Sequence, residues 1–219
     1  MQLSNARHRM LARAAREIKP GMVANLGIGL PTKVVNHIPK DLPVCLHTEN
    51  GLAGIGPSQS LESADRNLID AGGDYVSTVP GSAFFDSATS FAIVRSGRLD
   101  LTLLGAFEVA QNGDLANWKI PGKFSPGVGG GVELAQKARR TVVLTTHLDR
   151  NGNSKLRRAC SLPLTARACV SRIFTDMAVI DVRRSGFALI EIAAHTTISE
   201  VVAATDAPLI LPEHEPEVF

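Results

Sequence analysis

The sequence predicts an α/β fold, in which helices cover both faces of a mixed sheet. Segments rich in strand-forming residues alternate with segments of helical periodicity along the chain, and a few hairpins are added. The 219 residues are 44% hydrophobic, which is enough for a substantial core. Because no linker or charge run separates two halves, we expect a single domain over residues 1–219, with residues 212–219 as a frayed tail.

The first half of the chain is divided into elements by glycine and proline. Its expected elements are, in order, a helix over the first 19 residues, a strand at 22–26, a helix that begins near Pro31, a strand at 43–48, a loop at 57–75 with a short strand at 68–69, and a helix at 84–94. Pro20 and Gly21 end the first helix, and Gly97 closes the last one. Pro31 suits the first turn of a helix because its fixed φ is already helical.

The second half alternates in the same way and adds two hairpins. Its expected elements are a strand at 99–104, a hairpin with arms at 107–110 and 115–118, a helix at 132–139, a strand at 141–146, paired strands at 177–182 and 187–192, and a closing helix at 198–204. Asn112 followed by Gly113 is a strong hairpin signal. We expect this first hairpin to form a flap rather than part of the core.

Charge and cysteine content exclude several classes of function. The 23 basic and 21 acidic residues give a net charge of +2, so neither a nucleic-acid partner nor an anionic membrane surface is indicated. The three cysteines form no CxxC pair, so we expect no metal site and a reducing, cytoplasmic location. No apolar run approaches the roughly 20 residues that span a bilayer. Arginines in the first 19 residues could mimic a transit peptide, but an ordinary helix is the preferred interpretation.

The stretch from Val44 to Gly56 is the strongest candidate for a functional site. A run of strand-forming residues leads to Glu49, and Gly51, Gly54 and Gly56 then remove side chains from the approach. Ligands of open α/β proteins usually bind where such strands end. The simpler interpretation of an acid followed by Asn and Gly is a solvated turn.

A glycine-rich run precedes the expected helix at 132–139 and is the second candidate. It holds five glycines within ten residues, which suggests exposed backbone amides that could surround a charged group. A mobile loop without function is the alternative. Near residue 27 a shorter glycine turn lacks the third glycine of a dinucleotide-binding fingerprint.

Several motifs, in order along nearly the whole chain, are similar to the beta subunit of the family I coenzyme A transferases of the 3-oxoacid type. Those motifs are Leu46 to Gly51, Asn25 to Gly29 with Pro31 and Thr32, Gly105 to Val109, Gly113 to Trp118, Ile120 to Lys123, the glycines of 127–131, and Leu162 to Thr165. Thr48 stands where the family usually has Ser, and residues 131–133 also depart from the family pattern. These departures leave the acid in place and put the acyl specificity in doubt.

The resemblance implies a three-layer α/β/α fold with a mixed, mostly parallel sheet, like that of ribose-5-phosphate isomerase. It also implies a separate alpha subunit as partner, in an α2β2 heterotetramer, and coenzyme A thioesters as substrates without any further cofactor. Glu49 would be the nucleophile that carries CoA as a glutamyl thioester. The implied oxyanion and substrate-binding groups are Gly130, Gly129, Asn25, Asn50 and Gly51.

The chemistry suits a glutamate. Glutamate side chains, with a reference pKa of about 4.3, are ionised at pH 7, so such a nucleophile requires no general base. His47 lies near the acid and could tune it, but packing is its expected role. His147, Asp149, Arg95 and Lys123 are expected in turns or at the surface.

Other functions remain open at this point. The beta subunit of a 3-oxoadipate CoA-transferase has nearly the same signature. From other classes, a ligand-sensing domain of the same fold or a sugar-phosphate isomerase would use the same architecture. The sensing domain would need an added DNA-binding helix pair, and the isomerase would act without a partner subunit.

Overall fold

The computed structural model describes residues 2–125 and 127–219 of the chain. Its elements are, in order, α1 (Gln2–Ala15), β1 (Val23–Leu26), the 3₁₀ helix η1 (Pro31–His37), β2 (Cys45–Thr48), β3 (Leu52–Ser58), β4 (Val76–Phe84), α2 (Ser87–Arg95), β5 (Leu101–Leu104), β6 (Glu108–Ala110), β7 (Leu115–Ala116), α3 (Gly131–Lys137), β8 (Thr141–Leu144), β9 (Leu156–Arg157), β10 (Val170–Phe174), β11 (Ala178–Arg183), β12 (Gly186–Ile192), α4 (Ile198–Ala204), β13 (Leu209–Ile210) and β14 (Glu217–Val218). Met1 and Pro126, which belong to the expected first helix and the glycine-rich run, lie outside the described residues.

Eleven of the described strands form one mixed sheet. Their order is β13-β12-β11-β10-β8-β5-β1-β2-β3-β4, and β14 pairs with β12. The central strands β10, β8, β5, β1 and β2 are parallel, whereas β3 and β4 continue the sheet antiparallel at one end. The carboxyl ends of the central strands therefore meet at one edge of the sheet, where sites of α/β proteins usually form.

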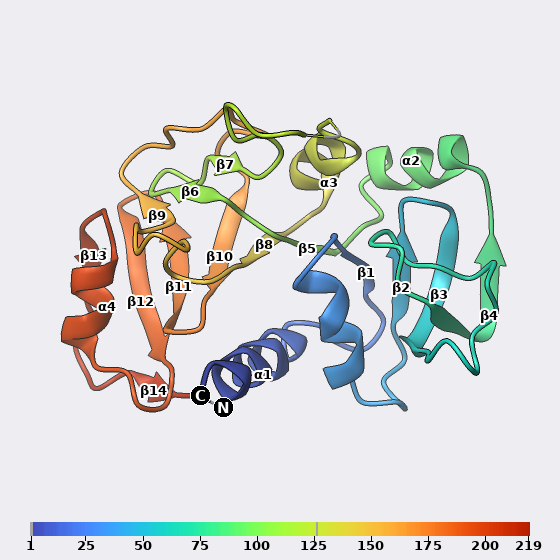
Figure 1. Ribbon diagram of the computed structural model, residues 1–219, viewed down its shortest axis with the longest axis horizontal. Coiled ribbons are helices and arrows are strands. Elements are labelled where there is room, and N and C mark those ends of the chain that lie inside the picture. Colours follow the sequence, from blue (N-terminus) through green and yellow to red (C-terminus); the bar gives the residue numbers. More distant parts are fainter. Residues whose placement is uncertain (1, 126) are drawn as a thin grey trace.

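The helices lie on both sides of this sheet, as the three-layer prediction requires. Figure 1 shows α1 on one side and α2 with α3 on the other. Side chains alternate along the strands, so Leu103 packs into the core under α1 and η1, and Leu104 packs into the core under α2 and α3. The second core also contains Val201 of α4.

The end of the helix expected at 84–94 was placed well, but its beginning was wrong. α2 begins at Ser87 because the Asp86 side chain accepts a hydrogen bond from the Thr89 amide and caps the helix. Phe84 instead ends the strand β4. The first helix also ends earlier than expected, at Ala15.

The region after Glu49 holds more strand than expected. β3 and β4 pair with each other, and the short strand expected at 68–69 is a single bridge between Ile69 and Tyr75. β10, also not expected, pairs with β8 and β11.

The hairpin of β6 and β7 is not a flap. Both strands are buried, and β6 pairs on its other side with β9 to form a second, three-stranded sheet. The C-terminal residues do not fray either. Glu217 and Val218 pair with β12, and Phe219 packs against the first core.

Candidate functional site

Glu49 lies directly after β2, at the edge of the sheet where the central parallel strands end. Its carboxylate is half-buried and is held by Asn25, a fully buried residue of the neighbouring strand β1. The Asn25 amide donates to the His47 carbonyl at 3.1 Å and to Glu49 Oε2 at 3.3 Å. Asn25 Oδ1 in turn accepts a hydrogen bond of 3.2 Å from Thr102 on β5. One buried amide thus ties three adjacent strands to the candidate nucleophile.

The glycine-rich run reaches the same place from a distant part of the sequence. A Cβ atom added to Gly130 would lie 3.7 Å from Glu49 Cγ, so the backbone at Gly130 packs against the glutamate side chain. Gly129, beside it, has a φ of +54°, a conformation that favours glycine. The structure therefore brings together Glu49, Asn25 and Gly130, three residues that the resemblance assigns to one site.

Asn50 and Gly51 stabilise the turn between β2 and β3. The Asn50 amide donates to the Ile69 carbonyl, and its oxygen accepts from the Thr48 hydroxyl. Gly51 has a φ of +114°, and a Cβ there would lie 2.1 Å from the Phe85 carbonyl oxygen. Both residues shape the backbone that presents Glu49 to the edge of the sheet.

His47 is packed, as expected, rather than presented to a substrate. Its ring is only 1% exposed, lies over Phe85, and places Nε2 3.0 Å from the hydroxyl of Ser90 on α2. Burial lowers the pKa of His47 to about 4, so the ring is neutral at pH 7. His47 consequently holds α2 against the strand that carries Glu49.

The remaining candidates are structural or exposed. His147 is buried between the Thr175 and Thr205 hydroxyls, at 3.0 and 2.9 Å. Asp149 accepts hydrogen bonds from amides of its own turn. Lys123 is exposed, and Arg95 forms an exposed ion pair with the Glu133 carboxylate at 2.6 Å.

Two neighbours of the site were not identified from the sequence. Thr102 is the one polar residue in the apolar strand β5, and Asn25 is the one polar residue in the apolar strand β1. Two such residues in buried strands could have indicated that they form a hydrogen bond with each other. Phe91 on α2 lies against Gly130, with ring atoms 2.8 Å from the position a Cβ would take. No signal in the sequence indicates that contact, because it depends on how α2 and the glycine loop pack.

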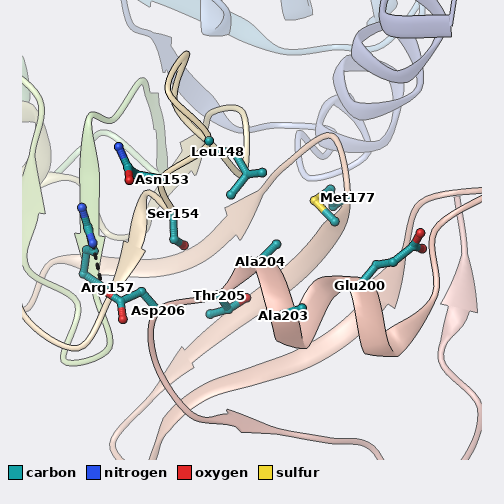
Figure 2. Close-up of a pocket in the computed structure, with 11 residues that line it drawn as sticks. Leu148, Asn153, Ser154, Arg157, Met177, Glu200, Ala203, Ala204, Thr205 and Asp206 are labelled. Carbon is teal, nitrogen blue, oxygen red and sulfur yellow. Dashed lines mark hydrogen bonds and ion pairs between the residues drawn. The ribbon is translucent and has the colours of Figure 1, made fainter.

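A separate pocket, with a volume of about 710 Å³, opens beside the C-terminal end of α4 (Figure 2). Its charged groups already have partners: Arg157 pairs with Asp206 at 2.8 Å, and Glu200 accepts hydrogen bonds from Thr197 at the start of α4. None of its lining residues belongs to β1, β2 or the glycine loop. The chemistry available at Glu49 therefore makes that residue, and not this pocket, the centre of the candidate site.

Within the described residues, no group of three or more His, Cys, Asp or Glu side chains could hold a metal ion. A helix long and apolar enough to cross a membrane is likewise absent from the part of the chain that the structure describes.

Comparison with known proteins gives consistent matches over nearly the full length. The model of the family described as coenzyme A transferase matches residues 8–204. The chain is 47% identical over 205 residues to the beta subunit of a probable succinyl-CoA:3-ketoacid coenzyme A transferase of Bacillus subtilis, covering 94% of this chain and 95% of that protein. It is 46% identical over 206 residues to the beta subunit of a 3-oxoadipate CoA-transferase of Pseudomonas putida, covering 94% and 96%.

Among solved structures, an acyl-CoA transferase from Escherichia coli O157:H7, in a thioester complex with CoA, superimposes with a TM-score of 0.76 at 21% identity. That match covers 96% of this chain and 42% of the solved chain. At this level of identity the likeness shows the fold alone, and it agrees with the three-layer arrangement described above.

Proposed function

This chain belongs to the coenzyme A transferase family, and from that premise we propose that it is the beta subunit of an enzyme that moves CoA between carboxylic acids. The proposed donor is succinyl-CoA or acetyl-CoA, and the proposed acceptor is a 3-oxoacid. The observation that carries the proposal is the carboxylate of Glu49, which hydrogen-bonds to the buried Asn25 amide and packs against the backbone of Gly130.

We propose a ping-pong reaction with Glu49 as the nucleophile. Its carboxylate oxygen attacks the thioester carbonyl, the carbon–sulfur bond breaks, and CoA leaves as a thiolate, so the acyl group remains on Glu49 as a mixed anhydride. The thiolate then attacks the Glu49 carbonyl, which releases the first acid as a carboxylate and leaves CoA on Glu49 as a thioester. An incoming acid reverses these steps and departs as the new acyl-CoA, so Glu49 is restored without any net proton transfer.

Each attack creates a tetrahedral oxyanion that needs hydrogen-bond donors. The packing of Gly130 against Glu49 supports a backbone amide in that role, because a glycine admits the reacting centre to its backbone. One such donor is typically worth about 3 to 4 kcal/mol of transition-state stabilisation. Asn25 supports the reaction from the other side, because its amide fixes the direction of one carboxylate oxygen.

The two relatives leave the acid specificity between a 3-oxoacid of the acetoacetate kind and 3-oxoadipate, since their identities to this chain, 47% and 46%, are almost equal. The carboxylate that 3-oxoadipate carries at its far end requires a cationic partner that a shorter 3-oxoacid does not. A screen of both acids against succinyl-CoA and acetyl-CoA would therefore separate the two specificities.

Both relatives are named as one subunit of a larger enzyme, which supports an alpha subunit as partner of this chain. We propose an α2β2 assembly that acts in the cytoplasm, where the three free cysteines would stay reduced. Co-expression with an alpha subunit is the direct test, and the beta chain by itself should have no transferase activity.

Mass spectrometry can detect the proposed glutamyl-CoA thioester. The assembled enzyme is incubated with the acyl-CoA donor, digested, and examined by mass spectrometry for the mass of CoA on the peptide that contains Glu49. Glu49→Ala should lose transfer and the adduct while keeping the melting temperature, whereas Glu62→Ala, at an exposed glutamate, should keep both. Retention of more than about a tenth of the rate by Glu49→Ala, which corresponds to about 1.4 kcal/mol, would refute the assignment.

A further inference from the structure

The backbone conformation at Gly130 does not require a glycine. Its φ of −77° and ψ of −3° lie at the border of the right-handed helical region, where φ is negative and other L-residues are also found. Gly127 and Gly129, by contrast, have positive φ values that favour glycine. A different constraint must therefore keep position 130 free of a side chain.

That constraint is the ring of Phe91. A Cβ atom at position 130 would lie 2.8 Å from both Cε1 and Cζ of Phe91, which is closer than carbon atoms pack. On its other side the same Cβ would be 3.7 Å from Glu49 Cγ, an ordinary contact. The backbone of Gly130 is thus held between an aromatic ring and the side chain of the proposed nucleophile.

Contacts on both sides of α2 hold the helix that carries Phe91. The preceding residue, Ser90, is buried, with its hydroxyl 3.0 Å from Nε2 of His47, two residues before Glu49. On the other side, the Arg95 guanidinium lies 5.8 Å from the centre of the Phe91 ring and pairs with Glu133 in the first turn of α3. α2 consequently links β2, the strand just before Glu49, to α3, the helix that follows Gly130.

We infer that Phe91 is a positioning residue of the transferase site: its ring supports the Gly130 backbone at the distance from Glu49 that the reaction requires. This inference rests on the proposed function and adds to it a residue that does not touch the reacting atoms. On this inference, position 130 must be glycine because the Phe91 ring leaves no space for a side chain. The effects of substitutions at positions 91 and 130 on kcat should therefore depend on each other.

A double-mutant cycle tests that dependence in the assembled enzyme. Gly130→Ala should lower kcat at least 100-fold, because the added methyl group meets the ring and displaces the loop from Glu49. Phe91→Ala should lower kcat about tenfold through loss of the support. The double variant Phe91→Ala with Gly130→Ala should recover at least tenfold in kcat over Gly130→Ala, because the methyl group then occupies space that the ring has vacated.

A neighbouring glycine supplies the matched control. A Cβ at Gly131 would lie no closer than 3.7 Å to any neighbour, so Gly131→Ala should retain the wild-type kcat. KM for the acyl-CoA should change less than threefold in every variant, since Phe91 acts on the reacting centre through Gly130; a general loss of folding would lower the melting temperature instead.

The outcomes separate the inference from the proposed function. If wild-type enzyme forms the CoA adduct on Glu49 but the double variant is as slow as Gly130→Ala, the role of Phe91 is wrong and the proposed function stands. Full activity of Gly130→Ala or of Phe91→Ala would likewise show that the role given to Phe91 is wrong, and the proposed function would stand. Absence of the adduct from active wild-type enzyme overturns the proposed function itself.

Discussion

At the scale of single residues, the site depends on how one buried amide is shared. Asn25 has no exposed surface, and its side chain bonds to groups on both neighbouring strands and to the Glu49 carboxylate. A buried polar group without a partner costs about 1 to 3 kcal/mol, so each of these bonds constrains the others. The direction of the Glu49 carboxylate is therefore set by the register between β1 and β2, in which Asn25 lies beside His47.

Asn25→Asp tests this arrangement with almost no change in shape. The new carboxylate would stand 3.3 Å from Glu49 Oε2 in place of a donor, and like charges at that distance raise the apparent pKa of the pair. We expect kcat to fall at least tenfold at pH 7 and the acidic limb of the profile of kcat/KM against pH to move to higher pH. The pH profile of the assembled enzyme measures both, and Asn36→Asp, at an exposed asparagine, should leave the profile unchanged.

At the scale of elements, local sequence predicted the interior better than the edge. Four of the five central strands, β1, β2, β5 and β8, and the helix α4 lie where apolar runs and periodicity indicated, because burial on both faces of a strand demands such runs; β10 was missed. β3 and β4 contain glycines and prolines that normally mark turns, and two register shifts interrupt their pairing. A pair of strands at the edge of a sheet tolerates proline. The sequence patterns that predict strands therefore do not identify β3 and β4.

The site was predictable to the extent that it lies in contiguous sequence. Glu49 and the glycine loop are each evident locally, and the resemblance brought them together before the structure did. The contact of Phe91 with Gly130 and the bond between Asn25 and Thr102 join residues distant in the chain. Such pairs follow from strand order and helix packing, which no local pattern encodes.

The attachment of α1 to the sheet depends on a buried charge. Glu17, just after the helix, is 7% exposed and pairs with Arg13, Arg140 and Arg172. Burial by itself would raise the pKa of Glu17, but Arg140 and Arg172 lower it below its usual value. The stability that this group contributes is therefore present above the unfolded pKa of about 4.3 and is lost as pH falls through the lower folded value.

Glu17→Gln should reduce the free energy of unfolding at pH 7 by about 3 kcal/mol, because three guanidinium groups lose their shared counter-charge. Urea denaturation measures the change. Arg139→Gln is the matched control, since Arg139 is 68% exposed in its pair with Asp100 and surface pairs contribute less than about 1 kcal/mol. Equal losses in the two variants would contradict the role given to the buried cluster.

At the scale of the whole molecule, acid sensitivity should arise in part from two buried histidines, His47 and His147. His47 adjoins α2, and His147 follows β8 and meets Thr205 just after α4. Burial is the main cause that lowers the pKa of each to about 4, and for His147 the nearby Asp176 opposes it only in part. An unfolded histidine has a pKa of about 6.5, so the unfolded chain binds more protons than the folded chain between these values.

Stability should therefore be complete above pH 6.5 and fall as pH decreases toward 4, by about 1.4 kcal/mol per pH unit for each histidine in the middle of that window. His147→Gln keeps a hydrogen-bonding side chain between Thr175 and Thr205 but cannot titrate, so it should remove the contribution of His147 to the slope. Urea denaturation between pH 7 and 4.5 measures the slopes, and carboxylate titrations cancel because both proteins share them. If the variant and the wild type lose stability in parallel across this window, His147 is not a source of the acid sensitivity, and the slope must arise elsewhere in the fold.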